Sequence, residues 1–162
     1  MVEVNLIHTI GDMWLKFLLI NGGPLIIVSC SGNYTVSRYL ESLRDQYRGI
    51  DSILIWLTYT NIGIDDRNQF ELVQAMPGGV EGIRTVVDQL HQEGVHTLFP
   101  YNPWDQGTHG GSLNNSKAES DDARRLAELL NITDADGFFG DTISSSGLQK
   151  FYDDSLANNH PA

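Results

Sequence analysis

VHTLFPYNPWDQGT, residues 95–108, begins as a short apolar run and ends in a polar segment that two prolines stiffen. Short apolar runs bounded by turn residues are typical of buried parallel strands, so residues 95–101 are predicted to form one. The residues before this strand place four apolar side chains on one face of a helix, namely Val80, Ile83, Val87 and Leu90. This part of the chain therefore predicts a helix, a strand and a loop in succession.

Similar apolar runs predict three more buried strands, at Leu25–Cys30, Ile53–Tyr59 and Asp136–Asp141. The strands that start at residues 53, 95 and 136 lie 42 and 41 residues apart. A strand, a loop, a helix and a return turn together need about this length in a repeating α/β architecture. The predicted fold class is therefore α/β, with repeating strand–helix units and a parallel sheet.

Three further helices are predicted, because apolar side chains recur at helical spacing in each of them. The first carries Val36, Tyr39, Leu40, Leu43 and Tyr47. The second carries Ala123, Leu126, Ala127 and Leu130, and it follows the helix-start signals Ser116, Glu119 and Ser120-Asp121-Asp122. The third carries Leu148, Phe151, Tyr152 and Leu156. Each set makes one apolar stripe.

Loop lengths indicate where a functional site would lie. Helices pass into strands through short segments at Gly49, Gly94 and Asn131–Asp134, whereas the longer loops Asn61–Gly79 and Gln106–Lys117 follow strands. Open α/β sheets and barrels both keep their sites at the carboxyl ends of the strands. We therefore expect the site in the loops that follow the strands.

The chain is expected to hold one α/β domain over residues 24–157. Residues 1–23 have no assigned role, although Trp14, Phe17 and Leu18 suggest a helix that covers the domain, and residues 158–162 are expected to be a disordered tail. Lys16 and the turn residues 21–24 interrupt the apolar stretch around them, so no transmembrane span is expected.

Composition argues against several partners and cofactors. The net charge of −11 comes from 21 acidic and 10 basic residues, and such a field repels nucleic acid and anionic membrane surfaces. Cys30 is the single cysteine, which excludes an internal disulfide and a cysteine-based zinc cluster and leaves the compartment undetermined. The histidines lack metal-ligand spacing and the glycine pairs lack a nucleotide fingerprint, so neither a metal nor another cofactor is expected.

The loop after the strand at residues 95–101 carries the first candidate residues. Tyr101 and Trp104 are predicted to offer aromatic faces to a sugar, with Asn102 and Asp105 as hydrogen-bonding partners for hydroxyl groups. Tyr59, at the end of the preceding predicted strand, is a further candidate substrate contact. The alternative is a packed loop in which Trp104 closes the core and Asp105 caps a turn.

Asp141 is the leading catalytic candidate, because it leaves a short apolar strand where barrel enzymes keep their carboxylates. Asp105 leaves the preceding strand, so the two carboxylates are predicted to share one pocket and act as a pair. The alternative for Asp141 is a helix cap, since an acid followed by Thr142 is also a helix-start signal.

The segments 95–108 and 134–142 together resemble the central strands of TIM-barrel glycoside hydrolases, over about residues 50–143 of this chain. The resemblance implies that Asp141 is a catalytic aspartate and that Tyr101, Trp104 and Asp105 contact substrate. A complete barrel has eight units in ~200–250 residues. Only four units are visible here, so the resemblance implies part of a (β/α)8 barrel.

Two classes of function therefore follow from the sequence. One is a glycoside hydrolase-like protein that acts on or binds carbohydrate, including a truncated and catalytically incomplete form. The other is a non-catalytic α/β module that binds carbohydrate or protein, and the sequence leaves open whether the chain is an enzyme. Self-association through an open sheet edge is expected if the barrel is partial.

Overall fold

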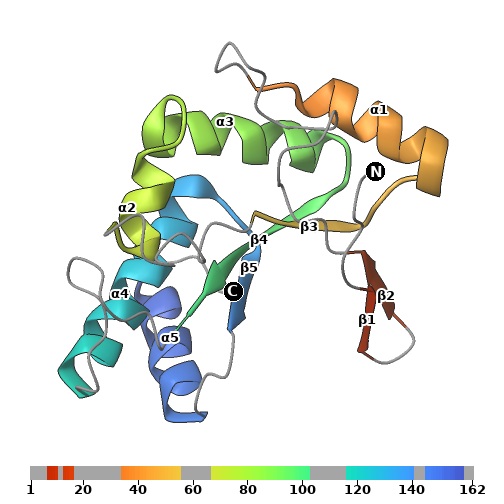
Figure 1. Ribbon diagram of the computed structural model, residues 1–162. Coiled ribbons are helices and arrows are strands. Elements are labelled where there is room, and N and C mark those ends of the chain that lie inside the picture. The colour runs from red at the N-terminus through yellow and green to blue at the C-terminus, as the bar shows by residue number, and fades with distance from the viewer. Residues whose placement is uncertain are drawn as a thin grey trace.

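The computed structural model describes residues 7–10, 13–16, 34–55, 67–102, 116–140 and 145–158 (Figure 1). Its strands are β1 (Ile7–Ile10), β2 (Met13–Lys16), β3 (Ser52–Leu54), β4 (His96–Tyr101) and β5 (Gly137–Gly140). Its helices are α1 (Val36–Tyr47), α2 (Gln69–Gln74), α3 (Gly79–Gln92), α4 (Ser116–Thr133) and α5 (Ser145–Ala157).

Strands β3, β4 and β5 form a parallel sheet in that order, with helices between them in the sequence. Ile53 of β3 pairs with Thr97, and Phe99 pairs with Phe138 of β5. The predicted α/β class with a parallel sheet is therefore confirmed. The predicted strand at Leu25–Cys30 and the end of the one at Ile53–Tyr59 lie outside the described residues.

All five described helices pack on one face of this sheet. Ile53 lies in a cluster with α1 and α3, while Phe99 and Tyr101 lie in a second cluster with α2, α3, α4 and α5. These residues share a face, because side chains alternate along a strand and paired residues of parallel strands point the same way. A doubly wound sheet has helices on both faces, whereas a barrel has them on its outer face alone. The arrangement is that of a sector of a barrel.

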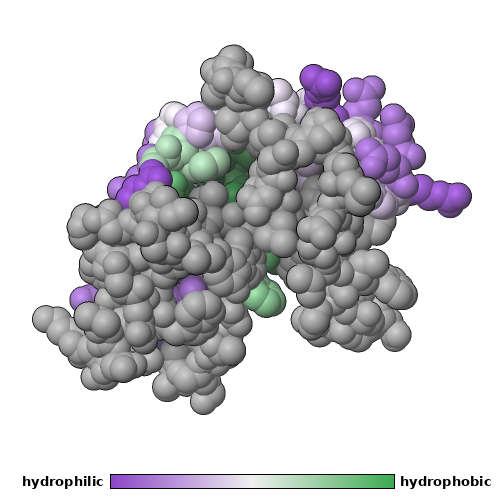
Figure 2. All heavy atoms as spheres, in the orientation of Figure 1, coloured by the Kyte–Doolittle hydropathy of each residue, from purple (hydrophilic) through white to green (hydrophobic). Residues whose placement is uncertain are grey.

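Helix α1 shows how the sequence sets a helix and its end. Val36, Tyr39, Leu40 and Leu43 are buried, as their spacing predicts, and the outer face of the helix is hydrophilic (Figure 2). The helix ends at Arg48 and Gly49, which have φ angles of 65° and 103°. Glycine adopts such positive angles without steric cost, and here its N–H reaches the carbonyl of Leu43. Gly94 and Asp134 also have positive φ angles, 73° and 59°, just after the ends of α3 and α4.

Helix α2 corrects the prediction of a continuous loop over Asn61–Gly79. Asn68 begins the helix with a capping box, since its side chain accepts the N–H groups of Phe70 and Glu71 and the Glu71 carboxylate accepts the N–H of Asn68. The spacing of Asn68 and Glu71 was a sequence signal for this helix. Its six residues are too few to show a helical period.

The two ends of the described chain also differ from expectation. Trp14 lies in β2, which pairs with β1 as an antiparallel hairpin, so the predicted covering helix is wrong at this residue. Asn158, placed in the predicted tail, still caps α5 through its bonds to the carbonyl of Asp154. Residues 159–162 lie outside the described part.

The helices carry no sign of a bilayer-crossing segment. In the described part of the chain, none combines the length and the apolar character that such a crossing requires.

Leu130→Ala should lower the free energy of unfolding by about 2–5 kcal/mol, because Leu130 is fully buried and the smaller side chain leaves a cavity between α4 and the sheet. Ile132→Ala is the matched control on the same helix, since Ile132 is 51% exposed and should change stability by less than about 0.5 kcal/mol. Urea denaturation followed by circular dichroism measures both. Equal losses in the two variants would contradict the placement of α4.

Candidate functional site

The carboxyl ends of β4 and β5 meet at one edge of the sheet. Tyr101 is the last residue of β4 and pairs with Gly140, the last residue of β5. Of the candidate residues from the sequence, the structure describes Tyr101 and Asn102 at this edge. The other candidates lie outside the described residues: Tyr59, Trp104, Asp105 and Asp141.

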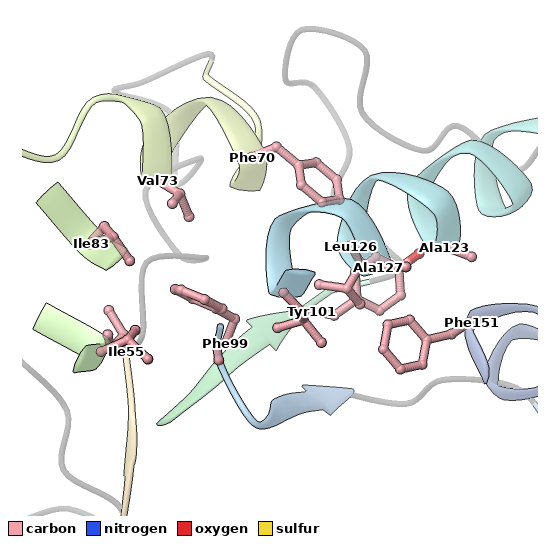
Figure 3. Close-up of a cluster of buried hydrophobic side chains, with 13 residues drawn as sticks. Ile55, Phe70, Val73, Ile83, Phe99, Tyr101, Ala123, Leu126, Ala127 and Phe151 are labelled. Atoms are coloured by element: carbon pink, nitrogen blue, oxygen red, sulfur yellow. The ribbon is translucent and has the colours of Figure 1, made fainter. Parts of the chain in front are cut away.

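Tyr101 is turned into the layer between the sheet and the helices. It is 5% exposed, and its ring lies edge-on to Phe138 with 6.2 Å between the ring centroids. Figure 3 shows it beside Leu126 and Ala127 of α4 and facing Phe151 of α5. In this structure the ring therefore supports the edge from within the core, where the sequence predicted a face open to a sugar.

The hydroxyl group of Tyr101 ties β4 to α4. It donates a hydrogen bond of 3.3 Å to Oδ2 of Asp122, a carboxylate that is itself only 4% exposed. Arg125 lies 3.9 Å from the other oxygen of Asp122, and its guanidinium group lies 4.1 Å from the ring centroid of Phe70 in α2. A buried carboxylate needs such partners, because an isolated one would lose its hydration without compensation. Two helices and a strand are thus joined around one acid.

Helix α4 begins at Ser116, the first of the helix-start signals in the sequence, so Asp122 lies inside the helix and not at its start. The signal for burial was its register, since Asp122 stands four and eight residues before Leu126 and Leu130 and therefore on the apolar face of the helix.

Gln69 holds the other side of the edge. Its side-chain Nε2 donates to the carbonyl of Asn102 at 3.2 Å, and its Oε1 accepts the N–H of Asn102 at 2.9 Å. Both residues are buried, at 8% and 2% exposure. No local pattern predicts this pair, because 33 residues separate its members and the helix that supplies Gln69 was not predicted.

The layer between α2, α4 and the sheet offers no room for a sugar at this point. A hollow lined by Phe70, Val73, Phe99 and Leu126 has space for about one water molecule and is largely apolar. A ligand site at this edge would therefore lie beyond the strand ends, outside the helix layer.

A cluster of ionisable groups lies at the opposite, amino edge. The two carboxylate oxygens of Asp136 contact Nε2 of His91 at 2.8 Å and Nδ1 of His96 at 2.7 Å, and one of them also accepts the N–H of Thr97. Burial alone would raise the pKa of Asp136, but these three donors outweigh it and hold the pKa below its ordinary value. The amino face of barrel sheets serves stability, so we assign the cluster to folding.

No group of three or more His, Cys, Asp or Glu side chains is arranged to hold a metal ion among the residues that the structure describes. The three members of the Asp136 cluster are instead bound to one another, since each imidazole contacts its own carboxylate oxygen.

Comparison with known proteins gives a likeness in fold. No model of a known protein family matches the chain, and no curated protein matches its sequence. Among solved structures, the alpha-amylase from Geobacillus thermoleovorans, complexed with acarbose, is similar over 88% of this chain with a TM-score of 0.56 and 13% identity. The match covers 43% of the amylase chain, so this chain spans less than half of its length.

These comparisons and the sheet define the class. The chain is an α/β protein whose fold resembles part of a TIM barrel. The solved structure that shows this resemblance is a glycoside hydrolase. At 13% identity the likeness shows the fold alone.

Asp136→Asn should destabilise the protein at pH 7, because an amide cannot serve three donors as a carboxylate does. Since the folded pKa of Asp136 is lowered, its contribution is present above the ordinary value of 3.8 and is lost as the pH falls through the folded pKa. The difference in unfolding free energy between wild type and variant should therefore shrink below pH 3.8.

Urea titrations between about pH 7 and pH 3 measure this difference. Asp45→Asn, on the exposed outer face of α1, is the control for removal of one negative charge. A pH-independent difference for Asp136→Asn would contradict the assignment.

Proposed function

We propose that this chain is a glycoside hydrolase-like protein that binds carbohydrate at the carboxyl edge of β4 and β5. The observation that carries the proposal is the register of these strands. Tyr101 pairs with Gly140, and the residues that follow them in the sequence are Asn102 and Asp141. The two segments richest in candidate side chains thus start from neighbouring positions at the edge where barrel enzymes keep their sites.

The candidate side chains suit a neutral sugar. Trp104 and Tyr59 supply aromatic faces for the C–H surfaces of a sugar ring. Asn102 is buried, so its part in the site is to anchor the segment that follows it. Asp105 and Asp141 supply two carboxylates, the minimum that glycoside hydrolysis by the usual mechanisms requires. The net charge of −11 disfavours anionic ligands and leaves neutral and cationic ligands open, and of these we propose neutral oligosaccharides.

The likeness in fold to the amylase supports the same proposal, because that structure is an alpha-amylase complexed with acarbose. Since the match covers 43% of the amylase chain, binding and hydrolysis are separate proposals for this chain. We propose binding as the property of the 162 residues themselves. Hydrolysis requires both carboxylates in one pocket.

Binding is tested by titrating intrinsic tryptophan fluorescence with acarbose and a panel of neutral oligosaccharides. A saturable response is expected, and Trp104→Ala should weaken binding by about tenfold or more through loss of the stacked face. Trp14→Phe, in β2, is the control for loss of an indole elsewhere. If no neutral sugar binds the folded chain by fluorescence or calorimetry, the proposal fails.

Asp141→Asn should lower kcat on an aryl glycoside by at least ~10²-fold in any form of the protein that hydrolyses it, because an amide supplies neither the charge nor the nucleophile. Asp153→Asn, an exposed change on α5, should leave kcat unchanged. Turnover is normalised to folded protein. A variant at Asp141 that keeps most of its turnover would identify this residue as a helix cap, and sugar binding without hydrolysis would identify a non-catalytic module.

A further inference from the structure

We infer that Gln69 is the positioning residue of this site: its side-chain amide takes the place of a neighbouring strand and fixes the main chain of Asn102. The role in sugar binding rests on the proposed function, whereas the fixing of Asn102 is a property of the fold. The argument starts from the hydrogen bonds along β4.

Even-numbered residues of β4 direct their main-chain groups toward β3. The N–H of His96 donates to the carbonyl of Asp51 at 3.0 Å, and the carbonyl of Leu98 accepts the N–H of Ile55 at 3.0 Å. In a parallel ladder, every second residue offers both its N–H and its carbonyl to the same neighbour. Asn102 continues this even-numbered series, and both of its groups are bound by Gln69.

A carboxamide suits this place because it has the donor and the acceptor of a peptide group. Glutamate at neutral pH could accept the N–H of Asn102 but would face its carbonyl with a second acceptor. Methionine has nearly the same length and offers neither group. In a buried setting, an unsatisfied main-chain group costs more than the bond itself is worth, so the residue type at position 69 is strongly constrained.

Gln69 is itself held in place from both sides. It is the first residue of α2, directly after the capping box of Asn68, and the next side chain, Phe70, is buried under the guanidinium group of Arg125. Its amide therefore keeps one orientation without a large loss of side-chain entropy on binding, which is the requirement for a positioning group.

The end of β4 is then fixed on two sides. Asp122 holds Tyr101 from the helix face, and Gln69 holds Asn102 from the side of β3. Since these are consecutive residues, the direction in which the chain leaves the sheet is set before the polar segment begins. This direction sets the starting point of the segment that carries Trp104 and Asp105, the residues proposed to contact a sugar.

The test compares Gln69→Met and Gln69→Glu with Gln74→Glu, the same chemical change at an exposed residue of the same helix. Amide hydrogen exchange at Asn102 and Phe99, urea stability and the calorimetric Kd for acarbose are measured for each. Gln69→Met should lower the protection of the Asn102 amide and the affinity for acarbose by about tenfold each, with Phe99 still protected. Gln74→Glu should match the wild type.

Gln69→Glu adds a pH-dependent change in the protection of the Asn102 amide. A difference in packing cannot produce this change, because glutamine and glutamate side chains have the same shape. At pH 7 it should behave like Gln69→Met. At a pH low enough to protonate the new carboxyl group, its O–H can donate to the carbonyl of Asn102 while its other oxygen accepts the N–H, and protection should return toward that of the wild type. Wild-type protein titrated in parallel accounts for Glu71, Asp122 and the other native acids.

Unchanged protection of Asn102 in folded Gln69→Met would overturn the inference, and so would an unchanged acarbose Kd when protection is lost. If Gln69→Met does not fold, a Gln69→Glu variant whose protection does not respond to pH overturns it. If neither acarbose nor any neutral oligosaccharide binds the wild type, the proposed function is refuted, while the exchange data still decide whether Gln69 fixes Asn102.

Discussion

The packing of all the described helices against one face of β4 and its neighbours is the constraint from which the other described features of this structure follow. Thr97, Phe99 and Tyr101 alternate toward that face, and Phe99 is 1% exposed within a cluster that draws on four helices. Parallel neighbours require crossovers, and here each crossover returns a helix to the same side. Within the described residues, helices thus cover the face that is the outer face in a barrel.

The two edges of the sheet are fixed by different chemistry. At the amino edge a single carboxylate, Asp136, collects two imidazoles and a main-chain N–H, so charge sets the geometry and pH affects it. At the carboxyl edge, Gln69 and the Tyr101–Asp122 pair use buried hydrogen bonds between groups of fixed direction. Buried hydrogen bonds between groups of fixed direction suit an edge that orients a ligand, because they hold an orientation as well as a distance.

The likeness to an amylase at 13% identity is understandable in the same terms. What the fold requires is an apolar residue at alternate strand positions and along one stripe of each helix, and many sequences satisfy this requirement. The fold therefore carries little information about chemistry. The proposed function depends instead on the polar residues that follow β4 and β5 in the sequence.

The sequence by itself determined the periodic parts of this protein. Apolar runs located β4 and β5, helical spacing located α1, α3, α4 and α5, and Gly49 and Gly94 marked turns whose positive φ angles favour glycine. These features depend on neighbours within a few residues, so a local pattern is sufficient to predict them. A capping box also encoded α2, although the helix was too short for its period to be recognised.

Only the tertiary structure decided which buried polar groups meet. Gln69 and Asn102 lie 33 residues apart in the sequence, and the three donors to Asp136 lie 39 to 45 residues before it. All of these partners are residue types that are common on protein surfaces. Tyr101 shows the same limit, since its place in the sequence suggested an exposed ring and its register on β4 turned it into the core. Such contacts are set by how the elements dock, because a buried donor must find an acceptor among whatever residues packing brings within reach.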